Sequence, residues 1–311
     1  MVNVHLIVKF IMKLRENKIT FDASTGAVFQ ELFNHPDYLV LDKDKQMELG
    51  LEWAENLYQF GSEHSSFDVY LGNVDTLIER SRGGTILDVG CYIGGKTIKW
   101  FERYQASAIY GIDVDSRFIE IANRFAEKKG SNAYFKVMLA EKLDFPDQYF
   151  DIILSENTFE HVRDLQCVME ECKRVLKKDG LLVIMFPPFW GATTHHLDLV
   201  TRMPCIHWFF KYSTLLDAYM SILDERGEEA LWYKPDNRHP LPFEKGLTIN
   251  GTGANEFHNL ACRNWSIVLD GYNQRNLHST FIKRNLEKGF KASQISLFRE
   301  IFPIAYVLRK R

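Results

Sequence analysis

Residues 85–95 read TILDVGCYIGG, a short apolar run that leads directly into a glycine-rich turn. The run at 85–89 is bounded by turn residues, which is typical of a short buried strand. The glycines that follow lack a Cβ and can take a positive φ, so the backbone can approach a ligand closely. A helix is expected next, at 96–104. This strand, turn and helix predict a nucleotide-type ligand site, although the turn alone is common to several protein classes.

The chain continues with the same alternation of strand and helix. Four more apolar runs predict strands at 108–112, 133–138, 150–155 and 181–186. Helices are expected at 116–130, with Asp115 as the cap and Gly130 as the end, and at 161–177. Five strands alternating with helices predict an α/β protein with a doubly wound, Rossmann-like and mostly parallel sheet. The ligand of such a sheet lies at the carboxyl ends of the strands.

Residues 1–80 predict a helical cap that precedes a sheet domain at 81–311. Apolar residues at 2–14 recur at helical spacing with basic residues towards another face, and residues 45–80 also show helical patterning, with a break at Gly61. A basic amphipathic helix can pack on the parent domain or lie on a membrane surface. We favour packing for residues 2–14 and keep peripheral membrane contact as the alternative.

The pattern breaks after the fifth predicted strand. Residues at about 188–254 are rich in aromatic residues, histidine, proline and glycine without steady periodicity, so we expect an inserted lid or substrate region there. Beyond it we expect a helix at 255–269, a strand at 276–282 and an apolar segment at 293–311. These last segments are expected to complete the sheet with antiparallel strands.

The composition of the 311 residues argues against several partners. Lys and Arg number 38 against 41 Asp and Glu, for a net charge of −3 without a long run of one sign, so no nucleic-acid partner is expected. The five cysteines form no Cys-x-x-Cys pair and are odd in number, which favours a reducing cytoplasm. Basic residues interrupt the apolar start, and no small-residue cleavage site follows it. Neither a signal peptide nor a transmembrane segment is therefore expected.

Two acidic residues sharpen the predicted ligand site. Asp88 lies two residues before Gly90, and Asp113 ends the second predicted strand, 23 residues after Gly90. A carboxylate at that place can accept hydrogen bonds from both ribose hydroxyls of an adenosine cofactor. Dinucleotide enzymes pair this acid with Gly-x-Gly-x-x-Gly, whereas the turn here reads GCYIGG. The acids therefore favour an adenosine cofactor of another kind.

With these residues the sequence resembles the class I S-adenosylmethionine-dependent methyltransferases across about residues 85–188. Four motifs match in order: ILDVGC at 86–91, YGID at 110–113, AEKLDFPD at 140–147 with FDII at 150–153, and RVLKKDG at 174–180. Their combination is specific, whereas any one motif alone is not. The resemblance implies a Rossmann-like fold, S-adenosylmethionine as the cofactor and methyl transfer as the reaction.

The resemblance also implies which residues contact the cofactor. They are Asp88, Gly90, Cys91 and Gly94 around the methionine half, Asp113 at the ribose, Val114, Ala140 and Glu141 along the adenine, and Ser155 and Glu156 near the reacting methyl group. Two positions depart from the family pattern. Tyr92 stands where a further glycine is usual, which is expected to reshape the loop around the methionine carboxylate. Leu139 stands where an acid is frequent, which removes a usual partner of the adenine amino group.

Histidines beyond the fifth predicted strand are the candidate bases for an acceptor hydroxyl. His195 and His196 follow that strand closely, and histidine titrates near neutral pH. A loop-ordering hydrogen bond to the backbone is the alternative for each. His161 is expected to be structural, and the aromatic residues at 207–210 to lie in the core or a substrate pocket. The spacing of these histidines with Asp198 matches no defined metal site, so no metal is expected.

These observations predict a methyltransferase that acts on a small-molecule, lipid-linked or glycan acceptor, at oxygen rather than at nitrogen or carbon. The preference for oxygen rests on the histidines alone. Two alternatives stay open: a non-catalytic protein that binds S-adenosylmethionine, and a nucleotide-dependent oxidoreductase built on the same kind of sheet. No substrate-defining motif occurs at 189–255, so the sequence does not name the acceptor.

Overall fold

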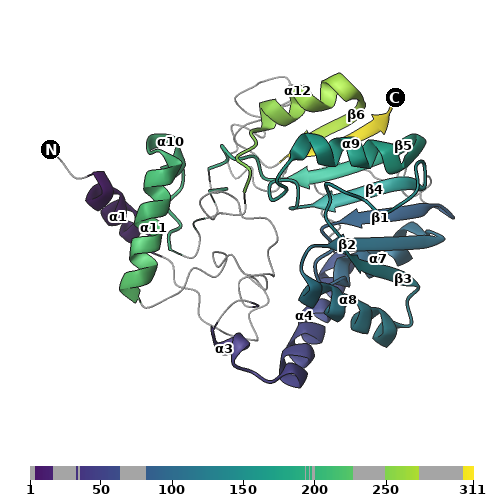
Figure 1. The fold of residues 1–311 in the computed structure, drawn as a ribbon, viewed down its shortest axis with the longest axis horizontal. Helices are drawn as coiled ribbons and strands as arrows, with labels where there is room; N and C mark the ends of the chain where they lie inside the picture. Colours follow the sequence, from purple (N-terminus) through teal and green to yellow (C-terminus); the bar gives the residue numbers. More distant parts are fainter. Residues whose placement is uncertain are drawn as a thin grey trace.

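A seven-stranded sheet, with helices beside it, occupies the right-hand side of Figure 1. The computed structural model describes residues 4–16, 33, 36–63, 82–192, 194, 195, 197, 200–226, 249–272 and 304–311. Its first five strands are β1 (Thr85–Val89), β2 (Ala108–Asp113), β3 (Ala133–Val137), β4 (Phe150–Glu156) and β5 (Leu176–Phe186). They are parallel and lie in the order β3-β2-β1-β4-β5. The predicted doubly wound, Rossmann-like sheet is confirmed.

Two antiparallel strands complete the sheet beyond β5. β7 (Ile304–Lys310) pairs with β5 on one side and with β6 (Trp265–Tyr272) on the other. Antiparallel completion was predicted correctly, but the helix predicted at 255–269 was wrong in its second half. The helix α12 (Ala254–Asn264) ends where Trp265 starts β6, and the aromatic and β-branched residues at 265–268 suit a strand. The strand predicted at 276–282 lies outside the described residues.

The helices that follow β2 and β4 are set by their caps. The carboxylate of Asp115 accepts a hydrogen bond from the Arg117 N–H and starts α8 (Ser116–Lys129), which ends at Gly130 as predicted. The carboxylate of Asp164 likewise starts α9 (Leu165–Val175), so this helix begins later and ends earlier than the predicted range 161–177. It ends early because Leu176 already pairs with Phe150 at the start of β5.

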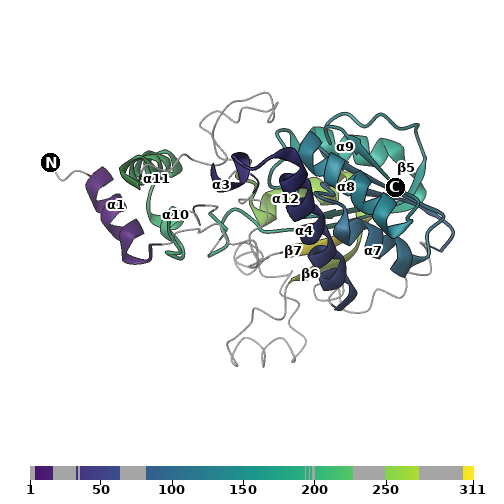
Figure 2. The ribbon, with the colours of Figure 1, turned by 90° about the horizontal axis from the view of Figure 1, so that it is seen from below.

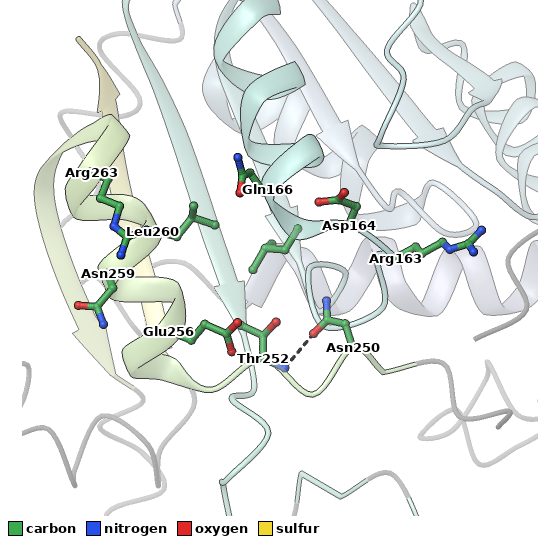
Figure 3. Close-up of a pocket in the computed structure, with 10 residues that line it drawn as sticks. Arg163, Asp164, Gln166, Asn250, Thr252, Glu256, Asn259, Leu260 and Arg263 are labelled. Carbon is green, nitrogen blue, oxygen red and sulfur yellow. Dashed lines mark hydrogen bonds between the residues drawn. The ribbon is translucent and has the colours of Figure 1, made fainter. Parts of the chain in front are cut away.

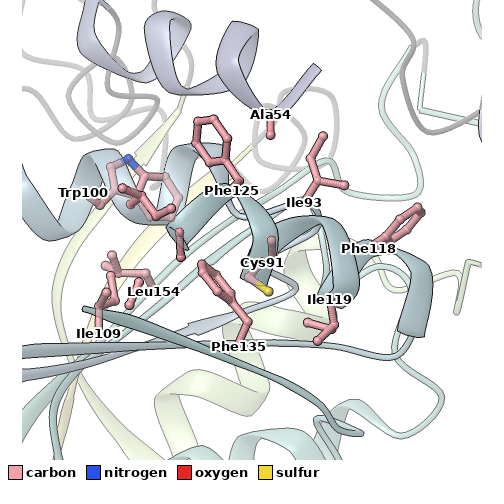
Figure 4. Packing of buried hydrophobic residues seen from close by; sticks show 14 of the residues in the cluster. Ala54, Cys91, Ile93, Trp100, Ile109, Phe118, Ile119, Phe125, Phe135 and Leu154 are labelled. Atoms are coloured by element: carbon pink, nitrogen blue, oxygen red, sulfur yellow. The ribbon is translucent and has the colours of Figure 1, made fainter. Parts of the chain in front are cut away.

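Alternate residues of the sheet belong to two separate cores, one on each face. Ile86 packs with α4 (Lys43–Glu63), α7 (Gly95–Tyr104) and α8, whereas its neighbour Leu87 packs with α9 and α12. Figure 2 shows α4, α7 and α8 near one another. The helix α4 continues through the break predicted at Gly61. Figure 4 shows the first core from close by, with Ala54 of α4 near Phe125 of α8 and Ile93 of the glycine-rich turn. Residues 64–80, also predicted as helical, lie outside the described residues.

A third, smaller core holds a helical unit made of residues 4–16 and 200–226. It contains α1 (Val4–Leu14), α10 (Ile206–Phe209) and α11 (Tyr212–Arg226), while the short α3 (Pro36–Leu39) lies before α4. Val8 and Met12 of α1 are fully buried against α11 residues such as Tyr219. The helix predicted at 2–14 therefore packs on the region after β5, more than 180 residues away along the chain. Within the described residues no helix has the length and apolar character needed to cross a bilayer.

Candidate active site

The glycine-rich turn after β1 is closed by its neighbours on both sides. The N–H groups of Gly90 and Cys91 both donate to the Ile112 carbonyl of β2, at 2.8 and 2.9 Å. Gly90 has a φ of +81°, and a Cβ there would lie 1.9 Å from the Thr158 Oγ1 of the loop after β4. Glycine is therefore required at position 90 by its backbone conformation and by the approach of that loop.

Asp88 ties the first strand to the helix that follows it. Its carboxylate is buried and accepts a hydrogen bond of 2.5 Å from the Thr97 hydroxyl of α7. Burial raises the pKa of Asp88 to about 7, although the Thr97 hydrogen bond acts in the opposite direction. The side chain predicted to lie beside the methionine half thus also fixes the first turn of α7.

Tyr92 stands where a glycine is usual, yet its backbone adopts the left-handed conformation that glycine favours. Its φ is +53°, in the left-handed region that few side chains adopt. The ring packs edge-on against Phe33 and Phe118, with centroids 5.9 and 4.6 Å away. The Tyr92 N–H donates to the Asp113 carboxylate at 3.0 Å. Packing of the ring and this hydrogen bond offset the strained backbone, so the loop keeps its turn.

Asp113 lies half-buried at the end of β2, where the ribose-binding carboxylate was predicted. One carboxylate oxygen accepts the Tyr92 N–H, and the other accepts the Asp115 N–H at 3.0 Å. Burial raises the pKa of Asp113 to about 6, and these N–H groups partly oppose the rise. The Val114 N–H also acts on this carboxylate, and with about four acceptor positions an ionised carboxylate can still accept a ribose hydroxyl beside these N–H groups. Val114 follows directly and is half-buried.

Three other predicted cofactor residues make contacts within the protein. The Ser155 hydroxyl is buried and donates to the Val89 carbonyl at 2.9 Å, which joins β4 to β1. The Glu141 carboxylate accepts the Arg163 N–H at 2.8 Å, just before α9 begins. Ala140 is buried in the core beneath that loop. These contacts hold the loops at the carboxyl end of the sheet whether or not a ligand is present.

Glu156 and Glu160, on the segment that leaves β4, both have little exposed side chain. The carboxylate of Glu156 pairs with Lys96 of α7 at 2.9 Å, and its side chain is 10% exposed. Glu160 is 7% exposed in its side chain and lies 3.7 Å from the His161 ring. In each glutamate the Oε2 atom is buried and has no hydrogen-bond partner among the described residues. Burial, with the nearby charge of Glu156, raises the pKa of Glu160 to about 8.

Asn250 clamps the loop that carries Glu160. Its side-chain amide donates to the carbonyls of Phe159 and Val162, at 2.7 and 3.0 Å. Its backbone N–H donates to the Glu160 carbonyl at 2.7 Å. The loop after β4 is therefore held by the point at which the chain returns from the predicted insertion.

His195, one of the two predicted bases, makes the backbone hydrogen bonds that were the alternative expectation for it. His195 is 1% exposed; its Nδ1 accepts the Leu197 N–H at 3.0 Å, and its Nε2 lies 3.1 Å from the Met203 carbonyl. With both ring nitrogens engaged by backbone groups, this histidine orders its loop and has no nitrogen available for an acceptor proton. Burial lowers the pKa of His195 to about 4. His196 lies outside the described residues, and His207 is buried among the rings of Phe189, Trp190 and His195.

A pocket of about 680 Å³ opens between the first turns of α9 and α12 (Figure 3). Its lining includes Arg163, Gln166, Thr252, Glu256 and Arg263. None of the residues predicted to hold the cofactor lines it. Asn250 is one of the residues that line this pocket, whereas Asp113 and Glu156 are not.

Sequence reasoning missed Glu160, Lys96 and Asn250. The Glu-His pair at 160–161 was visible, but it was interpreted as the start of a helix. Burial of a carboxylate without a partner has no sequence signature, and neither does a clamp between residues about 90 positions apart. Among the described residues, no group of three His, Cys, Asp or Glu side chains is arranged to hold a metal ion.

Comparison with known proteins identifies the domain. A family model described as a methyltransferase domain matches residues 87–184. An uncharacterized methyltransferase, YcgJ of Bacillus subtilis (strain 168), is 39% identical over 106 residues, which cover 33% of this chain and 41% of that protein. A ubiquinone biosynthesis O-methyltransferase of Chelativorans sp. (strain BNC1) is 35% identical over 102 residues, covering 33% and 40%. The chain thus spans about two fifths of the length of these curated relatives.

A solved structure with a related sheet is geranyl diphosphate C-methyltransferase from Streptomyces coelicolor A3(2), in complex with S-adenosyl-L-homocysteine and other ligands. It is 12% identical, with a TM-score of 0.47 over 76% of this chain and 74% of that one. The assignment itself rests on the matched domain model together with the parallel sheet, the glycine-rich turn and Asp113 at the end of β2. Residues 87–184 are therefore assigned as a methyltransferase domain built on the Rossmann-like sheet.

Proposed function

We propose that this protein transfers a methyl group from S-adenosylmethionine to a hydroxyl of a small-molecule, lipid-linked or glycan acceptor, and that Glu160 accepts the hydroxyl proton. The observation that carries the proposal is the pair of glutamates on the segment leaving β4, each with a buried oxygen that lacks a hydrogen-bond partner among the described residues. A relative named ubiquinone biosynthesis O-methyltransferase supports oxygen as the methylated atom.

The residues at the carboxyl end of the sheet fit the cofactor. Asp113, at the end of β2, can accept a ribose hydroxyl beside the backbone N–H groups that hold its carboxylate. Val114 would flank the adenine, and the turn at Gly90 lets the backbone approach the methionine half. When bound, S-adenosylmethionine supplies an electrophilic methyl group on a sulfonium. Glu156, at the end of β4, offers a negative charge on that side of the site.

Glu160 suits the role of proton acceptor better than His195, whose two ring nitrogens contact backbone groups. A base is most effective when its pKa lies near the working pH, and burial places the pKa of Glu160 at about 8. As the acceptor oxygen forms its bond to the methyl carbon, the hydroxyl proton passes to Glu160 Oε2. The Asn250 clamp fixes the backbone on both sides of Glu160, so the carboxyl group is positioned before the acceptor arrives.

Calorimetry tests the cofactor part of the proposal. We expect the wild-type protein to bind S-adenosylmethionine and S-adenosylhomocysteine but not NAD, and Asp113→Ala to lose at least tenfold in affinity for both. Asp144→Ala is the matched control, because the Asp144 side chain is 80% exposed and pairs only with Lys136 among the described residues. Binding of NAD in place of S-adenosylmethionine would overturn the proposal.

Transfer of a labelled methyl group tests the role of Glu160. A panel of phenols, catechols, isoprenoid-linked phenols and sugars serves as acceptors, and the activity is expected to rise with pH through about 8. Glu160→Gln should lower the transfer rate by roughly 100-fold or more, the range for loss of a general base, while S-adenosylhomocysteine binding is retained. Glu170→Gln, on the exposed side of α9, should leave the rate unchanged. A Glu160→Gln variant with full activity would remove Glu160 from the mechanism.

A further inference from the structure

The first helix of the chain exposes an apolar stripe on the side opposite its packing face. Leu6, Phe10 and Leu14 follow one another at intervals of four residues and are 61%, 65% and 60% exposed. Ile7 lies beside them and is 40% exposed. Side chains four residues apart share one face of a helix. We call these four residues the α1 stripe.

The packing of α1 on α11 fixes the direction in which the stripe faces. Val8 and Met12, on the other side of α1, are fully buried against α11. Lys9 and Lys13 both pair with Glu225 near the end of α11. These contacts account for one face of α1 and leave the α1 stripe directed outwards, so the stripe is a fixed surface of the folded protein.

Exposed apolar side chains are concentrated on the helical unit that contains this stripe. Thirteen large apolar side chains are exposed among the described residues, and seven of them belong to residues 4–16 and 200–226. Two of the seven, Trp208 and Phe209, lie on α10 and are 42% and 76% exposed. Single exposed apolar residues are ordinary on protein surfaces, but such a concentration marks an interaction surface.

The charge of the helical unit indicates what kind of partner its exposed apolar surface binds. Residues 4–16 and 200–226 contain six basic and four acidic side chains, whereas the whole chain has a net charge of −3. Lys13, Arg15, Arg202 and Lys211 are among the exposed basic residues. An apolar stripe on a helix that also carries exposed basic residues is the pattern of helices that lie in the interface of an anionic bilayer.

A second copy of the chain fits the stripe less well. Stable protein interfaces use about 20 to 30 residues on each side. The α1 stripe offers four residues on three helical turns, too few for such an interface. We therefore propose that the helical unit docks on the surface of an anionic lipid bilayer, with the α1 stripe inserted among the lipid headgroups.

Flotation with vesicles tests this proposal without any reference to catalysis. The full chain is mixed with vesicles of phosphatidylcholine and phosphatidylglycerol, or of phosphatidylcholine alone. Wild type is expected to float with the anionic vesicles, less with the neutral ones, and less at high salt. The double variant Leu6→Ser/Phe10→Ser should bind at least tenfold more weakly, because two of the four apolar side chains that enter the bilayer are lost.

The control is Val40→Ser, since Val40 is 82% exposed but lies outside the helical unit. It should bind as wild type does, and circular dichroism should show equal helix content in all three proteins. Equal vesicle binding by wild type and the double variant, or none by either, would overturn the proposal. So would sedimentation that shows a dimer for wild type and a monomer for the double variant, because the stripe would then serve a second copy.

Discussion

Asp113 illustrates how one carboxylate serves both the protein and its expected ligand. In the folded chain its two oxygens already accept the N–H groups of Tyr92 and Asp115. The sequence allowed the position of this acid to be predicted, because it follows an apolar run at a fixed distance from the glycines. It did not reveal that Tyr92 would take a positive φ and donate its N–H to Asp113, since that depends on the ring packing against Phe33 and Phe118.

The affinity for S-adenosylhomocysteine should depend on pH through Asp113. Ribose hydroxyls donate more strongly to an ionised carboxylate, and the pKa of Asp113 is about 6 in the protein. Affinity is therefore expected to be greatest above pH 6 and to fall by up to about tenfold for each pH unit below it. Calorimetry across this range checks the expectation. Asp113→Asn should bind weakly without that dependence, and an equally steep curve for this variant would assign the effect to another group.

At the scale of single elements, two boundaries were misplaced for one physical reason. The end of α9 and the end of α12 were each predicted too late, because residues beyond them continue an apolar pattern that a helix could also bury. The structure ends both helices where a strand partner is available: Leu176 meets Phe150, and Trp265 meets Lys310. Pairing between strands distant in sequence outweighs local helical preference, and a single sequence does not display that pairing.

The contact between α4 and α7 gives a prediction at this scale. Gly95 starts α7, and a Cβ there would lie 2.2 Å from the Ala54 carbonyl of α4. Gly95→Ala should therefore push α4 away and lower the free energy of unfolding by about 1–3 kcal/mol, the usual range for overpacking. Urea denaturation measures this loss.

The matched comparison is Gly130→Ala, where a Cβ would meet nothing within 4 Å but φ is +62°. That variant should lose about 1 kcal/mol from backbone strain alone. A Gly95→Ala protein as stable as wild type would mean that α4 is not held against α7 in solution.

For the molecule as a whole, the fold was predictable from the sequence where consecutive strands and helices also pack against one another. Residues 85–186 alternate strand and helix, and each helix covers the strands beside it, so local patterns were sufficient there. The helical unit could not be predicted from the sequence, because α1 packs on α11 and most of the chain lies between these two helices. Glu160 was overlooked for a similar reason, since its burial depends on Asn250 and on packing around the loop.

The stability of the whole protein should fall as pH rises from about 6.5 to 8. The pKa values of Asp88 and Glu160 are raised by burial to about 7 and about 8, so the folded state holds their protons where the unfolded chain has lost them. Stability from these groups is complete at low pH and is lost as pH rises through 7 and 8. The two groups together give a decline of about 2 kcal/mol across this window.

His195 and His207 do not change the sign of this trend. Burial lowers the pKa of each to about 4, so their contribution is lost only as pH falls below about 6.5 and is constant above that value. Urea denaturation at a series of pH values checks the decline. Glu160→Gln should reduce it by more than half, and a decline that this variant leaves intact would mean that Glu160 is already ionised in the folded protein.

The place of β7 between β5 and β6 has a consequence for synthesis. A ribosome makes β6 before β7, yet among the described strands β6 pairs with β7 alone. Until β7 is made, residues 265–272 lack that partner, and the antiparallel end of the sheet is not closed. Unpaired strands are the sites at which nascent chains associate wrongly. Synthesis of β7 therefore ends the interval in which the growing chain exposes β6 without its partner and is prone to wrong association.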